Sequence, residues 1–243
     1  MQGQRIWRTG VTDCLLIGMV SKGSTMALRV EEQRLAQAAS NVRWWPAALA
    51  LLVLGGAYAL VSDRLRVGPT WWLLVLTIAV VAGARVLRWR GFMRANRWLA
   101  IGTLAAITVA ITVSVGYLVE ALLRHSAEGA DLLRGGGLLW ATNVLTFALW
   151  YWEVDGGGPS HRHATRCGSS DFAFPQKVLG DGSDAHWLPE FVDYLFLAFN
   201  TSTAFSPTDT MVLARRAKLL MMYQSVVSLV TVVVLVARAI NAL

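Results

Sequence analysis

Long runs of the chain without a charged side chain constrain the fold more than any other feature. Residues 98–119 and 219–237 each reach the length of about 18 apolar residues that marks a transmembrane helix. Hydrophobic residues make up 55% of the chain and charged residues only 15%, whereas soluble domains contain about 25% charged residues. The sequence therefore predicts an all-α, polytopic helical membrane protein whose first partner is the lipid bilayer.

Three further apolar segments raise the expected number of spanning helices to five. Residues 44–61 open with a tryptophan pair, and residues 67–87 carry another pair near their start. Residues 137–151 complete the set, with tryptophans near their end. Tryptophan at the ends of apolar segments is typical of the aromatic belts at the membrane surface. The eleven tryptophans are therefore interpreted mainly as anchors rather than as a ligand-binding box.

The apolar segment of residues 189–200 is too short to cross a bilayer. A helix of this length rises only about 18 Å, whereas the hydrocarbon core is about 30 Å thick. We therefore expect a re-entrant half-helix that enters the membrane and turns back. Pro189 suits the first helical position, and Glu190 suits the positive end of the helix dipole. A hydroxyl-rich turn follows and leads into a final helix, which we expect over residues 211–241.

These segments divide the chain into three parts. Residues 1–43 form a basic N-terminal extension, and residues 44–134 form a three-helix transmembrane region. Residues 135–243 form a C-terminal module of an outer helix, a polar loop over residues 153–188, the half-helix and the final helix. The module thus contains the only segment that is expected to enter the membrane without crossing it.

The basic residues lie beside the membrane segments, so the net charge of +7 does not indicate nucleic-acid binding. The connection over residues 85–97 contains five arginines and no acidic residue, and the N-terminal extension has six basic residues against three acidic ones. By the positive-inside rule, both segments are expected to be cytoplasmic. This orientation places the polar loop and the half-helix on the cytoplasmic side of a bacterial inner membrane.

The cysteines and histidines do not form a convincing metal or redox motif. Cys14 and Cys167 are far apart and belong to no CxxC pair, so no disulfide framework is predicted. His161, His163 and Cys167 could bind a soft metal, but a flexible Ser-His-Arg-His run is a poor preformed site. We predict neither a metal nor a cofactor.

Two carboxylates, Glu153 and Asp155, precede the run Gly156-Gly157-Gly158-Pro159. Paired carboxylates can perform acid–base chemistry, but no nucleophile or further base is identifiable beside them. We therefore interpret them as a structural loop motif that caps a helix or pairs with Arg162, Arg166 or the basic start of the final helix. The chain is accordingly not expected to be an enzyme.

The half-helix and the turn after it carry a motif. Thr201-Ser202-Thr203-Ala204-Phe205 matches a Thr-x-Thr-Thr-Val pattern, and Ser206-Pro207-Thr208 follows it. Together with the apolar helices on either side, the segment of residues 191–242 resembles the pore helix, filter and inner helix of the two-transmembrane potassium-channel module. No glycine occurs after Gly182, so the filter glycines of that family are absent. The resemblance implies a homo-oligomeric pore module for small ions without potassium selectivity.

The resemblance also assigns a candidate constriction. Thr201, Ser202, Thr203 and Phe205 would line it, and Asp209 would form an acidic ring in an oligomer. The same polar residues could instead cap the adjoining helices. The sequence leaves both alternatives open.

A polar stripe marks the final helix, where Gln224, Ser228 and Thr231 recur at steps of four and three. The stripe either faces a hydrated pore or forms hydrogen bonds between packed helices. Asn143 lies within the outer helix, and an unsatisfied amide in lipid is costly, so this side chain is expected to face protein.

Further motifs occupy the second half of the chain. They are the runs over residues 147–159 and 203–210, and Phe174-Pro175-Gln176. Over residues 142–243 the chain resembles a family of uncharacterised bacterial membrane proteins that share these motifs. That resemblance implies one structural unit and brings no established activity.

Two functions remain as expectations. The first is an ion-channel-like pore module with weak or no potassium selectivity. The alternative is a non-conducting scaffold or partner subunit derived from a channel fold. A continuous hydrated path past Thr203 in a symmetric oligomer would favour the first, and a packed chain with the hydroxyls of residues 201–203 on helix ends would favour the second.

Overall fold

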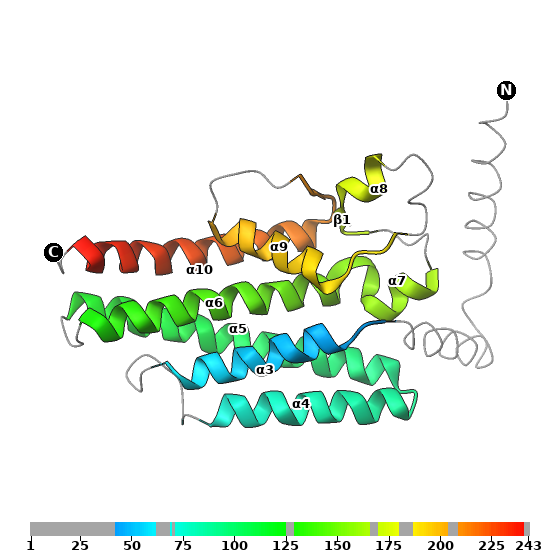
Figure 1. Cartoon of the computed structure of the whole chain (residues 1–243), viewed down its shortest axis with the longest axis horizontal. Coiled ribbons are helices and arrows are strands. Elements are labelled where there is room, and N and C mark those ends of the chain that lie inside the picture. The colour runs from blue at the N-terminus through cyan, green and yellow to red at the C-terminus, as the bar shows by residue number, and fades with distance from the viewer. Residues whose placement is uncertain are drawn as a thin grey trace.

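The computed structural model describes residues 42–61, 69, 71–124, 129–165, 170–179, 187–203 and 209–240. Within these ranges the chain is almost entirely helical (Figure 1). The basic extension was expected over residues 1–43, and its residues 1–41 lie outside the described part of the chain. The structure therefore bears on the helical region and on the C-terminal module.

Five helices form the main bundle: α3 (Trp45–Ala59), α4 (Trp72–Trp89), α5 (Met93–Leu123), α6 (Gly129–Val154) and α10 (Arg215–Ile240). All except α3 are long and apolar enough to cross a membrane, which confirms the expected all-α polytopic fold but gives four candidate spanning helices among the described residues instead of the expected five. Helix α3 has 15 residues and is apolar but short. Its length of about 22 Å at 1.5 Å per residue is less than the hydrocarbon thickness.

Consecutive helices of the bundle run antiparallel, so their ends gather at two opposite ends of the molecule (Figure 1). We name one of these the polar end; it holds the start of α3, the α4–α5 turn, the end of α6 and the start of α10. The Arg88 guanidinium of α4 lies 4.3 Å from the ring centroid of Trp44, which joins two of these elements. The arginine-rich connection and the loop after α6 thus lie at the same end, as the charge pattern requires.

Tryptophans divide into two groups in the structure. The exposed ones lie at or near helix ends: Trp45, Trp71, Trp89 and Trp98. Their positions fit an aromatic belt at the membrane surface. Trp44 and Trp152 instead pack against each other edge to face, with ring centroids 5.1 Å apart. Anchoring therefore explains only part of the tryptophan content.

The short helix α9 (Phe191–Thr203) enters the bundle at the polar end and stops inside it. Near its start, the Tyr194 hydroxyl donates to Asp155 at the end of α6 (2.5 Å). Near its end, Ser202 accepts a hydrogen bond from Gln224, well inside α10. The chain then returns to the polar end before α10 begins (Figure 1). Helix α9 is therefore re-entrant, as its length predicts.

The bounds of α9 differ from the expected residues 189–200. It begins at Phe191 because the Asp193 carboxylate accepts the backbone N–H of Glu190 (2.7 Å), which is one half of a capping box. Pro189 therefore lies outside the helix. At the other end the helix continues to Thr203, since the first hydroxyls of the turn bond to backbone carbonyls one turn earlier.

The final helix begins at Arg215 rather than at residue 211. Two strands account for the difference, because β2 (Met211–Val212) pairs antiparallel with β1 (Phe172–Ala173). The backbone N–H of Leu213 then donates to the carbonyl of Asp171 (2.9 Å). These long-range contacts hold the start of α10 against the loop.

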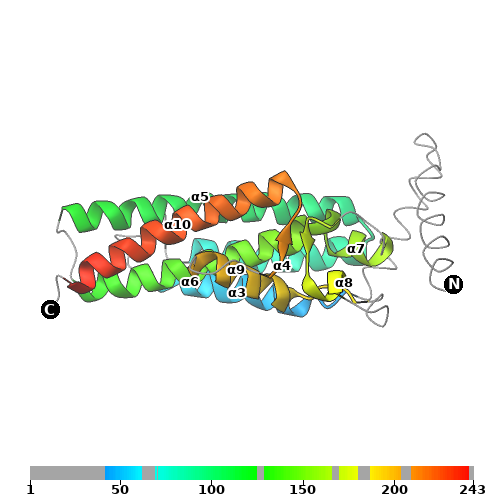
Figure 2. The ribbon, with the colours of Figure 1, turned by 90° about the horizontal axis from the view of Figure 1, so that it is seen from above.

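The expected boundary between residues 134 and 135 falls inside α6. The three glycines that follow this boundary continue the helix, and Gly136 lies in close contact with α10. A Cβ at this position would lie 2.6 Å from Leu235 Cδ2. Figure 2 shows α10 lying diagonally over α5 and α6, which requires such a close crossing. Helix packing therefore overrides the low helix propensity of glycine.

The loop expected over residues 153–188 contains regular structure. It includes the 3₁₀ turn η1 (Asp155–Gly157), α7 (Pro159–Thr165), β1 and α8 (Pro175–Leu179). Gly156, Gly157 and Gly158 all have positive φ, between 56° and 100°. Glycine adopts this conformation without the steric penalty of other residues, so the glycine run is required for the turn after α6.

Candidate functional site

The polar stripe of α10 faces the interior of one chain. Gln224, Ser228 and Thr231 are at most 1% exposed. They lie between α10 and its neighbours α6 and α9 rather than on the outer surface of the bundle. The stripe therefore does not form an exposed face that several copies could share around a common axis.

Gln224 is the centre of a hydrogen-bonded cluster that links three helices. Its Nε2 donates to the carbonyl of Ala198 (2.8 Å) and to the hydroxyl of Ser202 (2.7 Å), both on α9. Its Oε1 accepts the hydroxyl of Tyr151, on α6. We use the name polar seam for these three side chains, Gln224, Ser202 and Tyr151, together with Asn143 and Ser228.

The seam continues toward the middle of the bundle. Asn143 Nδ2 donates to Ser228 Oγ (2.8 Å), which joins α6 to α10. Thr231 Oγ1 donates to the carbonyl of Val227 (2.8 Å) within its own helix. These contacts correspond to the second alternative for the stripe, in which its polar side chains form hydrogen bonds between packed helices.

The residues of the candidate constriction are not brought together. Thr201 and Thr203 donate to backbone carbonyls of α9, whereas Ser202 joins the polar seam. Phe205 lies outside the described residues. Asp209 is exposed and precedes β2, so it lies outside α10, which begins at Arg215.

A second polar cluster lies at the polar end and is centred on Asp155, which is fully buried. Its Oδ1 accepts the backbone N–H groups of Asp171 (2.6 Å) and Phe172 (3.3 Å) and the hydroxyl of Ser170 (3.0 Å). Its Oδ2 accepts the Tyr194 hydroxyl. Burial raises the pKa of this phenol well above its ordinary value, so Tyr194 remains a donor. We call this cluster the carboxylate hub.

Asp171 extends the hub to α10. Its carboxylate receives a bidentate contact from Arg216, through Nε (3.1 Å) and Nη2 (2.7 Å), and accepts the N–H of Gly156 (3.2 Å). Arg162 Nη1 donates to the carbonyls of Trp152 and Asp155 (2.8 and 2.6 Å). The expected pairing with the basic start of α10 therefore involves Asp171, which the sequence did not single out. Arg166 lies outside the described residues.

Glu153, the other member of the loop motif, does not join the hub. Two residues along a helix correspond to a rotation of about 200°, so Glu153 and Asp155 point in opposite directions. Glu153 is buried beside the guanidinium groups of Arg88, Arg97 and Arg162. It belongs to a different part of the polar end, between α6 and the α4–α5 turn.

The hydrogen bonds of these clusters connect α6, α9, α10 and the loop between α6 and α9. Among the described residues, no group of three His, Cys, Asp or Glu side chains is placed to hold a metal ion. Cys167 lies outside those residues, and His161 Nδ1 contacts the carbonyl of Gly156 (2.8 Å). The carboxylates of the hub accept hydrogen bonds from backbone, tyrosine and arginine donors.

Fold and site together define the class of the protein, an all-α polytopic membrane protein with a re-entrant helix held by two buried polar clusters. No protein-family model, curated protein or solved structure matches the chain. The likeness to the potassium-channel module and to the bacterial membrane-protein family is therefore a resemblance of motifs.

Proposed function

We propose that the chain is a membrane scaffold or partner subunit whose channel-like module does not conduct ions. The main support for this proposal is the hydrogen bonding of the Gln224 side chain. Both amide protons and the carbonyl oxygen of this side chain are engaged by residues of the same chain. A polar group that lines an ion path must instead be free to replace the water around the ion.

The outer face of α10 supports the same proposal. Its exposed side chains are large and apolar and include Leu219, Met222, Val226, Leu229 and Val233. Such a face suits contact with lipid or with another membrane protein. Its one exposed hydroxyl, that of Tyr223, contacts the Thr112 hydroxyl on α5 of the same chain, so α10 in an oligomer would present a mainly apolar wall.

A second candidate, an ion path within one chain, is favoured by one observation. Asn143 is 1% exposed, and its Oδ1 has no hydrogen-bond partner among the described residues. The nearby Trp140 Nε1, on the same helix, also has no hydrogen-bond partner among the described residues. Both groups lie in the central part of α6, beside the end of α9, and transporters often bind ions at such interrupted helices near the membrane midplane.

Ion flux into liposomes that contain the purified protein separates the two candidates. The scaffold proposal predicts no potassium, sodium or chloride flux above that of protein-free liposomes. Protein-dependent flux that Asn143→Leu and Thr203→Trp abolish would contradict it and would support the path within one chain. Val226→Trp is the matched control, because it adds the same bulk on the outer face of α10.

A further inference from the structure

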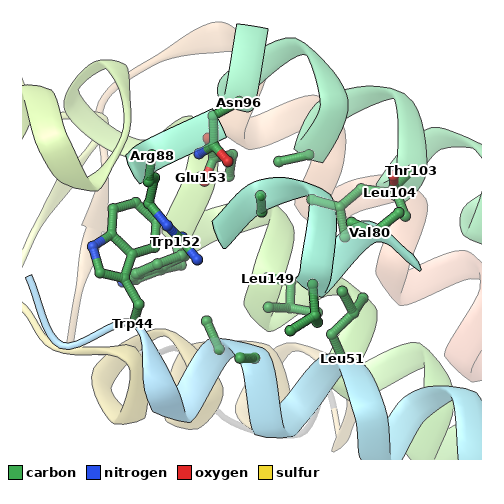
Figure 3. A pocket seen from close by; sticks show the side chains of 15 residues that line it. Trp44, Leu51, Val80, Arg88, Asn96, Thr103, Leu104, Leu149, Trp152 and Glu153 are labelled. Atoms are coloured by element: carbon green, nitrogen blue, oxygen red, sulfur yellow. The ribbon is translucent and has the colours of Figure 1, made fainter. Parts of the chain in front are cut away.

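A cavity of about 80 Å³ lies at the polar end between α3, α4, α5 and α6 (Figure 3). Helices α3 and α4 are in close contact at Gly55, where a Cβ would lie 2.4 Å from Thr77 Oγ1. From that contact they diverge toward the polar end (Figure 1). The cavity occupies the space that this divergence leaves.

The walls of the cavity are apolar and follow the helix axes. They include Ala48, Leu51, Val80, Ala84, Leu104 and Leu149. The lining on α3 extends from Trp44 to Leu51, which is about 10 Å along the helix, and that on α4 extends over a similar length. The cavity is therefore a slot that runs from the membrane surface toward the membrane interior.

The outer end of the slot is polar. Trp44, Arg88, Asn96 and Glu153 lie there, each near the end of a different helix (Figure 3). Asn96 is 7% exposed, and its Oδ1 has no hydrogen-bond partner in the part of the chain that the structure describes. A buried acceptor without a donor is costly, so a ligand with a hydroxyl group would satisfy it.

The charges at this end favour an anion. Three guanidinium groups, those of Arg88, Arg97 and Arg162, lie near enough to act electrostatically on the single carboxylate of Glu153. Arg88 itself lines the slot and stacks on Trp44. Basic groups between transmembrane helices at the membrane surface are typical binding sites for anionic lipid headgroups.

We infer that the slot binds an anionic phospholipid with a glycerol headgroup. The phosphate lies at Arg88, a headgroup hydroxyl donates to Asn96 Oδ1, and the first methylenes of one acyl chain enter the apolar slot. The volume is about half that of an engineered cavity of about 150 Å³ that holds benzene, so the slot takes only the first few methylenes of the chain. The rest of the lipid remains in the bilayer. This inference does not depend on whether the C-terminal module conducts.

Native mass spectrometry of the purified full chain tests the site by titration with phosphatidylglycerol and with phosphatidylcholine of the same acyl chains. Wild type is expected to retain phosphatidylglycerol preferentially. Arg88→Gln is expected to weaken that binding about tenfold, the loss typical of one charge-assisted hydrogen-bonded contact. Arg90→Gln removes the same charge from an exposed position outside the slot and is expected to change binding little. Equal losses in the two variants would show binding by surface charge alone and would overturn the inference.

Two further comparisons test the slot and the hydroxyl separately. Ala84→Leu fills the slot and is expected to reduce phosphatidylglycerol binding, whereas Ala82→Leu, on the exposed face of α4, is not. Phosphatidylmethanol carries the same phosphodiester charge without a hydroxyl, so wild type is expected to bind it more weakly. Asn96→Ala should remove that difference. Unchanged binding by the folded Ala84→Leu variant, or no preference for the hydroxyl in wild type, would contradict the inference.

Discussion

Removal of the Asp155 carboxylate is expected to destabilise the C-terminal module. The substitution Asp155→Ala leaves three buried donors without their acceptor: the Tyr194 hydroxyl and the backbone N–H groups of Asp171 and Phe172. Each such group costs about 1–3 kcal/mol. The contributions are not additive, and part of the loss is recovered by relaxation. We expect a total loss of about 3–5 kcal/mol in the free energy of unfolding, as for other broken buried charge contacts.

Unfolding of the purified protein in detergent, followed by tryptophan fluorescence, measures this loss. Asp155→Asn retains one acceptor oxygen and is expected to cost only about 1–2 kcal/mol. A double-mutant cycle between Asp155→Asn and Tyr194→Phe should show a coupling of about 1–2 kcal/mol, because the two groups are in direct contact. Asp209→Ala is the control, since this carboxylate is exposed and its removal should change stability by less than about 0.5 kcal/mol. A similar small effect for Asp155→Ala would refute the structural role of the hub.

Two further matched pairs test the packing in the same assay. Gly55→Ala places a Cβ against Thr77 and is expected to cost about 1–3 kcal/mol, whereas Gly56→Ala meets no atom within 4 Å and should be neutral or stabilising by up to about 1 kcal/mol. Equal effects would contradict the close contact of α3 and α4. Arg216→Ala removes the bidentate contact to a buried carboxylate and is expected to cost about 1–2 kcal/mol, while Arg215→Ala should change stability by less than about 0.5 kcal/mol. A loss that is the same for both arginines would point to general charge effects.

The sequence predicted the spanning helices and the re-entrant helix for a simple physical reason. In a bilayer every backbone polar group must be satisfied internally, so a long uncharged apolar run has to be a helix. Length alone then separates α4, α5, α6 and α10 from α9, whose 13 residues cannot cross, but it does not separate α9 from α3, whose 15 residues are also too few. These predictions depend on local sequence and on the thickness of the membrane, and they need no knowledge of which helices touch.

The contacts of the site could not be predicted in the same way. Asp171 binds Arg216 across 45 residues, and no local pattern distinguishes it from other loop acids. Similarly, the close contact of Gly136 with α10 depends on a residue 99 positions away, Leu235, and no local pattern predicts it. One signal was available in the sequence, since the spacing of two between Glu153 and Asp155 already predicts that they lie on different sides of a helix.

The fold of the C-terminal module requires that the segment from the start of α9 to the start of α10 enters and leaves the membrane at the same end. In a chain with Cys14 and Cys167 replaced by serine, single cysteines at the exposed positions Glu190 and Leu213 lie before and after the re-entrant segment. A membrane-impermeant maleimide is expected to label both from the same side, and a cysteine at Arg124 only from the other. Labelling of positions 190 and 213 from opposite sides would mean that α9 crosses the membrane, and it would contradict the fold described for the C-terminal module.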